Sequence, residues 1–174
     1  RGMNRCVLGT DRTDPEKAPP CRACIAQTRA LMGREPVAWF EAPPDESLSR
    51  TLEGLTISEL STYEHPLSQS AGVIPLGLLA LPALRWVLRR HHLSDDEPTR
   101  FLLRQFILSA WNVTRAFTAL LELENPRAII VFNGQFFPEA TARWVAQQRG
   151  LPVITHEVGL RPFTAFFTPG EATA

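Results

Sequence analysis

The sequence predicts an α/β fold, a Rossmann-like parallel sheet flanked by helices, with a long helical hairpin inserted before a C-terminal βαβ unit. An apolar strand at 127–132 is followed by a turn, a helix from Phe137 to Arg149 and a second strand from Leu151 to Thr155, which is the spacing of a βαβ unit. Ahead of it, two helical segments are joined by a charged turn. The length of 174 residues fits one domain over residues 1–174.

The first part of the chain predicts short elements separated by loops. Residues 1–20 are polar and rich in turn residues, and a helix is expected over 21–32. The apolar run from Val37 to Phe40 lies between prolines, which predicts a short buried strand. Two short helices are expected next, over 45–54 and 57–63.

The middle of the chain predicts the helical hairpin. The segment 73–92 is apolar, then amphipathic and basic, and two prolines loosen it. Ser94 and Glu97 have the spacing of a capping box, so a long helix is expected to begin there. We expect this helix to bury one face, because apolar residues recur along it every three or four positions. These residues are Leu103, Phe106, Ile107, Ala110, Val113, Phe117, Leu120 and Leu121.

The predicted sheet has few strands. The strands at 129–132 and 153–155 are apolar on both faces, so helices are expected above and below them, and 163–168 offers a further strand. Such a small sheet is expected to expose an apolar edge or face near the chain ends. The chain starts without Met and stops directly after a strand-like run, so both ends are expected to be cuts from a longer protein.

Charge and hydropathy exclude several classes of protein. Eighteen basic and 18 acidic residues give no net charge, whereas nucleic-acid-binding domains carry a basic excess. The longest uncharged apolar run, residues 72–84, is broken by prolines and is too short to span a membrane, and no signal peptide is evident. No nucleic-acid partner and no transmembrane segment are therefore expected. A cytoplasmic location is expected, and peripheral contact at the inner face of the membrane stays open.

Two polar loops follow the two strands of the βαβ unit, and the carboxyl ends of parallel strands meet at one edge of a sheet. The candidate site residues are Asn133, Gly134 and Glu139 in the first loop and His156, Glu157 and Arg161 in the second. The first loop is suited to hold a hydroxyl or a phosphate, and the second to supply a base with a charge partner. The structural alternative is a tight turn in the first loop and a hydrogen-bonded histidine beside a solvated glutamate in the second.

The cysteines suggest a competing function. Cys21 and Cys24 are expected to begin a helix, where the helix dipole lowers the pKa of a thiol, and Cys6 precedes them. A structural zinc needs four ligands, and no fourth has matching spacing, so no metal site is assigned within the chain. Three alternatives remain: reduced structural cysteines, a metal or cluster site completed elsewhere, and redox chemistry.

A basic cluster at the turn of the helical hairpin could meet an anionic substrate, an acidic partner or lipid phosphates, and docking of the acidic partner is the non-catalytic hypothesis. Its members are Arg85, Arg89, Arg90, His91, His92, Arg100 and Arg104. Three acidic residues, 95–97, lie in the same turn. Internal pairing of these charges is the alternative interpretation.

The loops at 132–139 and 155–159 together resemble bacterial capsule and surface-polysaccharide biosynthesis proteins of glycosyltransferase type, and the segments 19–24 and 74–97 are similar to the same group. The resemblance implies a GT-B architecture of two Rossmann-like domains, with this chain the N-terminal, acceptor-side domain. It implies a saccharide acceptor, and a nucleotide-sugar donor bound mainly by a missing C-terminal domain. The chain alone is therefore expected to bind no cofactor and to be inactive.

The resemblance also implies roles for single residues. His156 or Glu157 would accept the proton of the acceptor hydroxyl, and Asn133 and Glu139 would line the cleft. Some relatives carry Arg where Gln135 and Val158 stand, so the roles of those arginines are not carried over.

Overall fold

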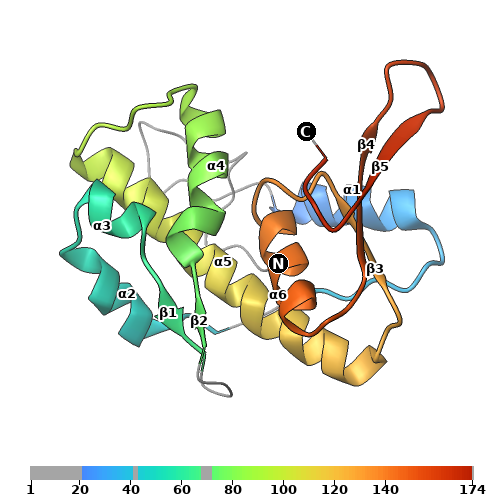
Figure 1. Ribbon diagram of the computed structural model, residues 1–174, viewed down its shortest axis with the longest axis horizontal. Helices are drawn as coiled ribbons and strands as arrows, with labels where there is room; N and C mark the ends of the chain where they lie inside the picture. The colour runs from blue at the N-terminus through green and yellow to red at the C-terminus, as the bar shows by residue number, and fades with distance from the viewer. Residues whose placement is uncertain (1–20, 41–42, 68–71, 174) are drawn as a thin grey trace.

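A long helix, α5 (Glu97–Glu124), runs diagonally through the structure and joins a helical body to a small sheet (Figure 1). The structure is a computed structural model that describes residues 21–40, 43–67 and 72–173. Besides α5, the helical body contains α2 (Glu46–Glu53), α3 (Ile57–Ser61), α4 (Leu76–Leu88), β1 (His65–Pro66) and β2 (Val73–Ile74). The sheet region contains α6 (Glu139–Gln148), β3 (Ile129–Phe132), β4 (Val153–Val158) and β5 (Ala165–Pro169).

The long helix begins at a different cap from the one that the sequence predicts. The Asp96 carboxylate accepts a hydrogen bond from the backbone N–H of Thr99 at 2.9 Å, so Asp96 is the N-cap and the capping box expected at Ser94 is wrong. Asp96 has extended backbone, and Pro98 stands in the first helical turn, where it needs no hydrogen bond of its own. An aspartate followed by this proline therefore determines where the helix starts.

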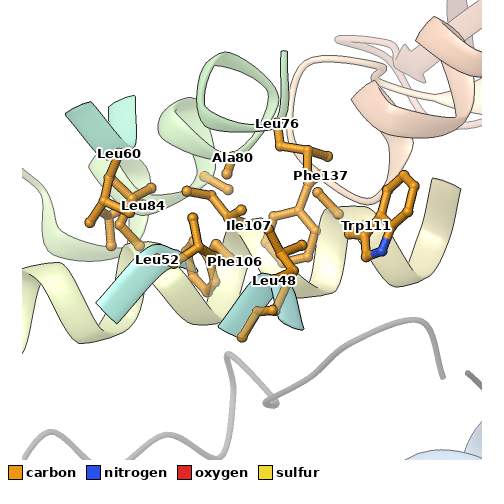
Figure 2. Packing of buried hydrophobic residues seen from close by; sticks show 14 of the residues in the cluster. Leu48, Leu52, Leu60, Leu76, Ala80, Leu84, Phe106, Ile107, Trp111 and Phe137 are labelled. Carbon is orange, nitrogen blue, oxygen red and sulfur yellow. The ribbon is translucent and has the colours of Figure 1, made fainter. Parts of the chain in front are cut away.

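The main core lies between α5 and the helices α2, α3 and α4 (Figure 2). The apolar face expected for α5 is confirmed, since six of its eight predicted positions are buried and Phe117 and Leu120 are half-buried. Opposite this face lie the buried side chains of Leu48, Leu52, Leu60, Leu76, Ala80 and Leu84. The Trp111 indole also donates a hydrogen bond to the Asp45 carboxylate at 2.9 Å. This bond ties the start of α2 to α5.

Gly77 lets α4 pack directly on the end of α3. A Cβ atom at this position would lie 2.2 Å from the carbonyl oxygen of Leu60 and 2.7 Å from that of Ser61. Gly77→Ala is therefore expected to destabilise the fold by about 1–3 kcal/mol through overpacking, although alanine is the better helix former. The matched control is Gly54→Ala, where a Cβ meets nothing within 4 Å. Urea unfolding measures both variants, and equal midpoints would contradict this account of the packing.

The sheet is mixed. β3 and β4 pair in parallel, with Phe132 opposite His156, whereas β5 pairs antiparallel with β4. The predicted βαβ unit is confirmed as β3–α6–β4, but the expectation of a purely parallel sheet is wrong. Only residues 159–164 separate β4 from β5, and a parallel neighbour would need a crossover of about a dozen residues.

Helices cover one face of the sheet in the described part of the chain. α6 packs against β3 and β4, and Val131, Ala146 and Val153 form a small buried cluster there. On the other face, Ile130 is 69% exposed and Ile154 is 36% exposed. The expectation of coverage on both faces is therefore wrong for the described residues, whereas the exposed apolar face is confirmed.

The segment 37–40 is not a strand. It has no regular secondary structure, and Val37 and Trp39 are exposed. The Phe40 ring packs on Phe117 with 6.2 Å between centroids, while the preceding helix α1 (Cys21–Met32) is mostly exposed. Among the described residues no strand pairs with this segment, so an apolar run between prolines is not sufficient to predict a strand.

Candidate functional site

The loop after β3 turns sharply at Asn133 and Gly134, as the sequence predicts. Both residues have left-handed backbone, with φ of +55° and +80°. A Cβ atom at Gly134 would also lie 2.7 Å from the Thr155 methyl group. Glycine is therefore required at this position by conformation and by space, and the turn brings the end of β3 close to β4.

The Asn133 side chain holds the end of β4 and the C-terminal segment. Its amide nitrogen donates to the Glu157 carboxylate at 2.9 Å and to the Thr173 carbonyl at 3.1 Å. Its amide oxygen accepts from the N–H of Gln135 at 3.0 Å. These bonds fix the direction of the amide. Asn133 thus positions Glu157.

The two acidic residues expected at the site have opposite pKa shifts. The hydrogen bond from Asn133, together with one from the N–H of Val158, lowers the pKa of Glu157. Burial raises the pKa of Glu139, which stands in the first turn of α6. A pair of carboxylates whose surroundings separate their pKa values is typical of acid–base chemistry, because one stays ionised while the other becomes a stronger base.

The expected pair of His156 and Glu157 lies on a strand, and the nearby His156 is a minor cause of the lowered pKa of Glu157. They are consecutive residues of β4, which extends to Val158, so the expectation that both lie in a loop is wrong. Adjacent strand residues point to opposite faces. The His156 ring contacts Phe132 and Phe167, with centroids 5.4 and 6.1 Å apart. Glu157 instead faces Asn133 on the other side of the strand, and the role of His156 as a base stays a prediction.

A hollow of about 400 Å³ lies between α4 and the loop that joins β3 to α6. Its aromatic and apolar lining consists of Ala83, Trp86, Val87, Phe132, Phe136, Phe137 and Pro138. Its polar lining consists of Asn133, Glu139 and Glu157, three of the residues that the sequence predicts for the site. The structure therefore gathers an amide and two carboxylates at the edge of an aromatic surface.

The aromatic part of this hollow was not foreseen from the sequence. Trp86 is 52% exposed on α4, and its ring lies 5.8 Å from that of Phe136. The Arg89 guanidinium lies over the Trp86 ring, 4.9 Å from the ring centroid. The signal in the sequence was the aromatic pair Phe136–Phe137, directly after the tight turn.

Arg161 does not line the hollow. It lies in the turn that joins β4 to β5, at the tip of a hairpin that projects from the sheet (Figure 1). Its backbone carbonyl accepts a hydrogen bond from the Thr164 hydroxyl at 2.7 Å. Because β4 and β5 pair up to Val158, Arg161 lies beyond the end of the sheet and away from the hollow.

The described part of the chain does not test the cysteine site. Cys6 and the side chain of Cys21 lie outside the described residues, and Cys24 is a free, exposed thiol. Among the described residues, no group of three or more His, Cys, Asp or Glu side chains could hold a metal ion. The cysteine hypotheses stay untested.

Two of the seven members of the basic cluster pair with acidic residues of the same turn, as the alternative interpretation expects. Arg100 contacts Asp95 at 3.0 Å and Glu97 at 3.3 Å, and Arg104 also contacts Glu97. The acidic residues of the turn therefore neutralise part of the cluster.

The comparisons with family models, curated proteins and solved structures found no match for this chain. Any function proposed for this chain therefore rests on the geometry of the site. Within the residues that the structure describes, no helix combines the length and the apolarity that crossing a bilayer requires.

Proposed function

We propose that this chain is the acceptor-side domain of a cytoplasmic glycosyltransferase of surface or capsular polysaccharide biosynthesis, and that the hollow beside Glu139 takes the saccharide acceptor. The observation that carries the proposal is the lining of the hollow, two carboxylates at the edge of an aromatic surface. A sugar ring has an apolar face that packs on aromatic rings and hydroxyls that donate to carboxylates.

The proposed reaction gives the two carboxylates different roles. The acceptor hydroxyl oxygen attacks the anomeric carbon of a nucleotide sugar, the bond to the diphosphate breaks, and the hydroxyl proton passes to a base. Glu139 is that base, because burial raises its pKa and makes it the better proton acceptor. Glu157, held by Asn133, accepts a hydrogen bond from a second hydroxyl and orients the acceptor. The donor binds mainly to a domain outside this chain.

Saccharide binding to the chain is the direct test. Saturation-transfer NMR with the methyl glycosides of glucose, galactose and N-acetylglucosamine is expected to show transfer to the protons of at least one ring. Trp86→Ala is expected to weaken that signal about fivefold or more, because it removes an exposed aromatic ring from the lining of the hollow. The matched control is Trp39→Ala, an exposed tryptophan outside the hollow.

Two outcomes would contradict the proposal. One is the absence of transfer from all three glycosides. The other is an equal loss of signal in the Trp86→Ala and Trp39→Ala variants, since binding would then not depend on the hollow.

A further inference from the structure

The β4–β5 hairpin projects from the sheet (Figure 1), and the large apolar side chains at its tip are exposed. Leu160 is 95% exposed and Phe163 is 108% exposed, and Val158 at the base of the turn is 70% exposed. Three large apolar side chains this exposed within six residues form a patch, whereas single exposed apolar side chains are common, and such a patch indicates a surface that a partner or a membrane covers.

The turn holds these side chains outward through defined bonds. The N–H of Gly159 donates to the carbonyl of Thr164 at 2.7 Å, and the Thr164 hydroxyl donates to the carbonyl of Arg161 at the same distance. Phe163 has a φ of +58°, which a bulky residue rarely adopts. A Cβ atom at Gly159 would lie 2.0 Å from the Thr164 hydroxyl oxygen. These bonds and close contacts define the shape of the turn, and this shape leaves Leu160 and Phe163 exposed.

The charge of this region identifies the covering surface. From Val158 to Phe166 the only ionisable side chain is that of Arg161. Apolar side chains at a convex tip that carries one basic and no acidic side chain suit the interface of an anionic bilayer.

We propose that the hairpin tip inserts Leu160 and Phe163 into the surface of an anionic phospholipid membrane, with Arg161 at the level of the lipid phosphates. A second copy of the chain fits the tip less well, because two tips related by a twofold axis would bring their Arg161 guanidinium groups together. The tip is convex and narrow, which suits a deformable lipid surface that closes around it. The inference is independent of the proposed glycosyltransferase activity.

Co-sedimentation of the whole chain with vesicles tests this. Binding is expected to vesicles of phosphatidylcholine mixed with phosphatidylglycerol and to be much weaker with phosphatidylcholine alone. The double variant Leu160→Ser, Phe163→Ser is expected to bind about tenfold more weakly or worse, because it removes both apolar side chains that the membrane would bury. The matched control is Leu123→Ser, since Leu123 is 79% exposed near the end of α5 at the opposite edge.

Three outcomes would overturn the proposal. The tip variant and the control bind the mixed vesicles equally, the parent chain binds neither kind of vesicle, or the parent is a dimer in size-exclusion chromatography that the tip variant dissociates. The last outcome would assign the tip to a second copy of the chain. Circular dichroism is expected to show an unchanged fold in each variant, because all three side chains are exposed.

Discussion

Replacing Glu139 by glutamine is expected to lower sugar transfer by about 10²- to 10⁴-fold, the range by which a positioned general base accelerates proton transfer. The prediction rests on the proposed function. Glutamine keeps the size and the hydrogen-bonding oxygen of the side chain but cannot accept the proton. Transfer is measured in the protein that contains this chain with its donor domain, as release of nucleoside diphosphate from a panel of nucleotide sugars.

The same variant is expected to be at least as stable as the parent at neutral pH. Burial raises the pKa of Glu139 above the value in the unfolded chain. Between the pKa of Glu139 in the unfolded chain and its higher pKa in the folded chain, a rise in pH removes the Glu139 proton from the unfolded chain first. The free energy of unfolding of the parent therefore falls as the pH rises through this range. The glutamine variant has no such loss. A drop in activity together with an unchanged or higher melting temperature at pH 7 separates a catalytic role from a folding defect.

Two further substitutions make this result specific. Glu171→Gln is the matched control, because the Glu171 side chain is 82% exposed and lies outside the hollow. His156→Ala tests the other face of the sheet, where that ring contacts Phe132 and Phe167. A full loss of transfer in His156→Ala with normal activity in Glu139→Gln would move the base to His156. That result would contradict the assignment of Glu139.

Local patterns in the sequence were enough to predict much of this arrangement. The apolar run at 129–132, the helix after it and the second strand form the expected βαβ unit, because each is determined by residues close together in the chain. The tight turn followed from Asn133 and Gly134, which tolerate left-handed backbone. These features placed Asn133 and Glu157 within hydrogen-bond distance of each other, as the structure shows.

Features that depend on distant partners could not be predicted in this way. The direction of β5 is an exception: the apolar composition of 163–168 is the same for a parallel and an antiparallel strand, but the short connection to β4 is visible in the sequence and indicates the antiparallel direction. The hairpin then extends β4 to Val158 and turns His156 and Glu157 to opposite faces. The contribution of α4 to the hollow depends on tertiary packing, so no local pattern pointed to Trp86.

Replacing Phe106 by alanine is expected to destabilise the fold by about 3–5 kcal/mol, the cost of deleting a buried aromatic ring. Phe106 is 3% exposed in the middle of α5, and its ring centroid lies 4.9 Å from that of Phe137. Urea unfolding followed by circular dichroism measures the loss. The control is Phe163→Ala, which also deletes a phenyl ring, but one at the exposed hairpin tip. It is expected to change the free energy of unfolding by less than about 0.5 kcal/mol.

The Phe106 variant also tests how the core supports the candidate site. Phe137 packs on Phe106 from the loop between β3 and α6 and lines the hollow, so a cavity at position 106 leaves this loop without its support. Saccharide binding by Phe106→Ala is therefore expected to be weaker than that of the parent under conditions where the variant is still folded. Equal binding would show that Asn133 and its hydrogen bonds hold the loop without the aromatic contact. A loss of stability no larger than that of Phe163→Ala would contradict the position of Phe106 in the core.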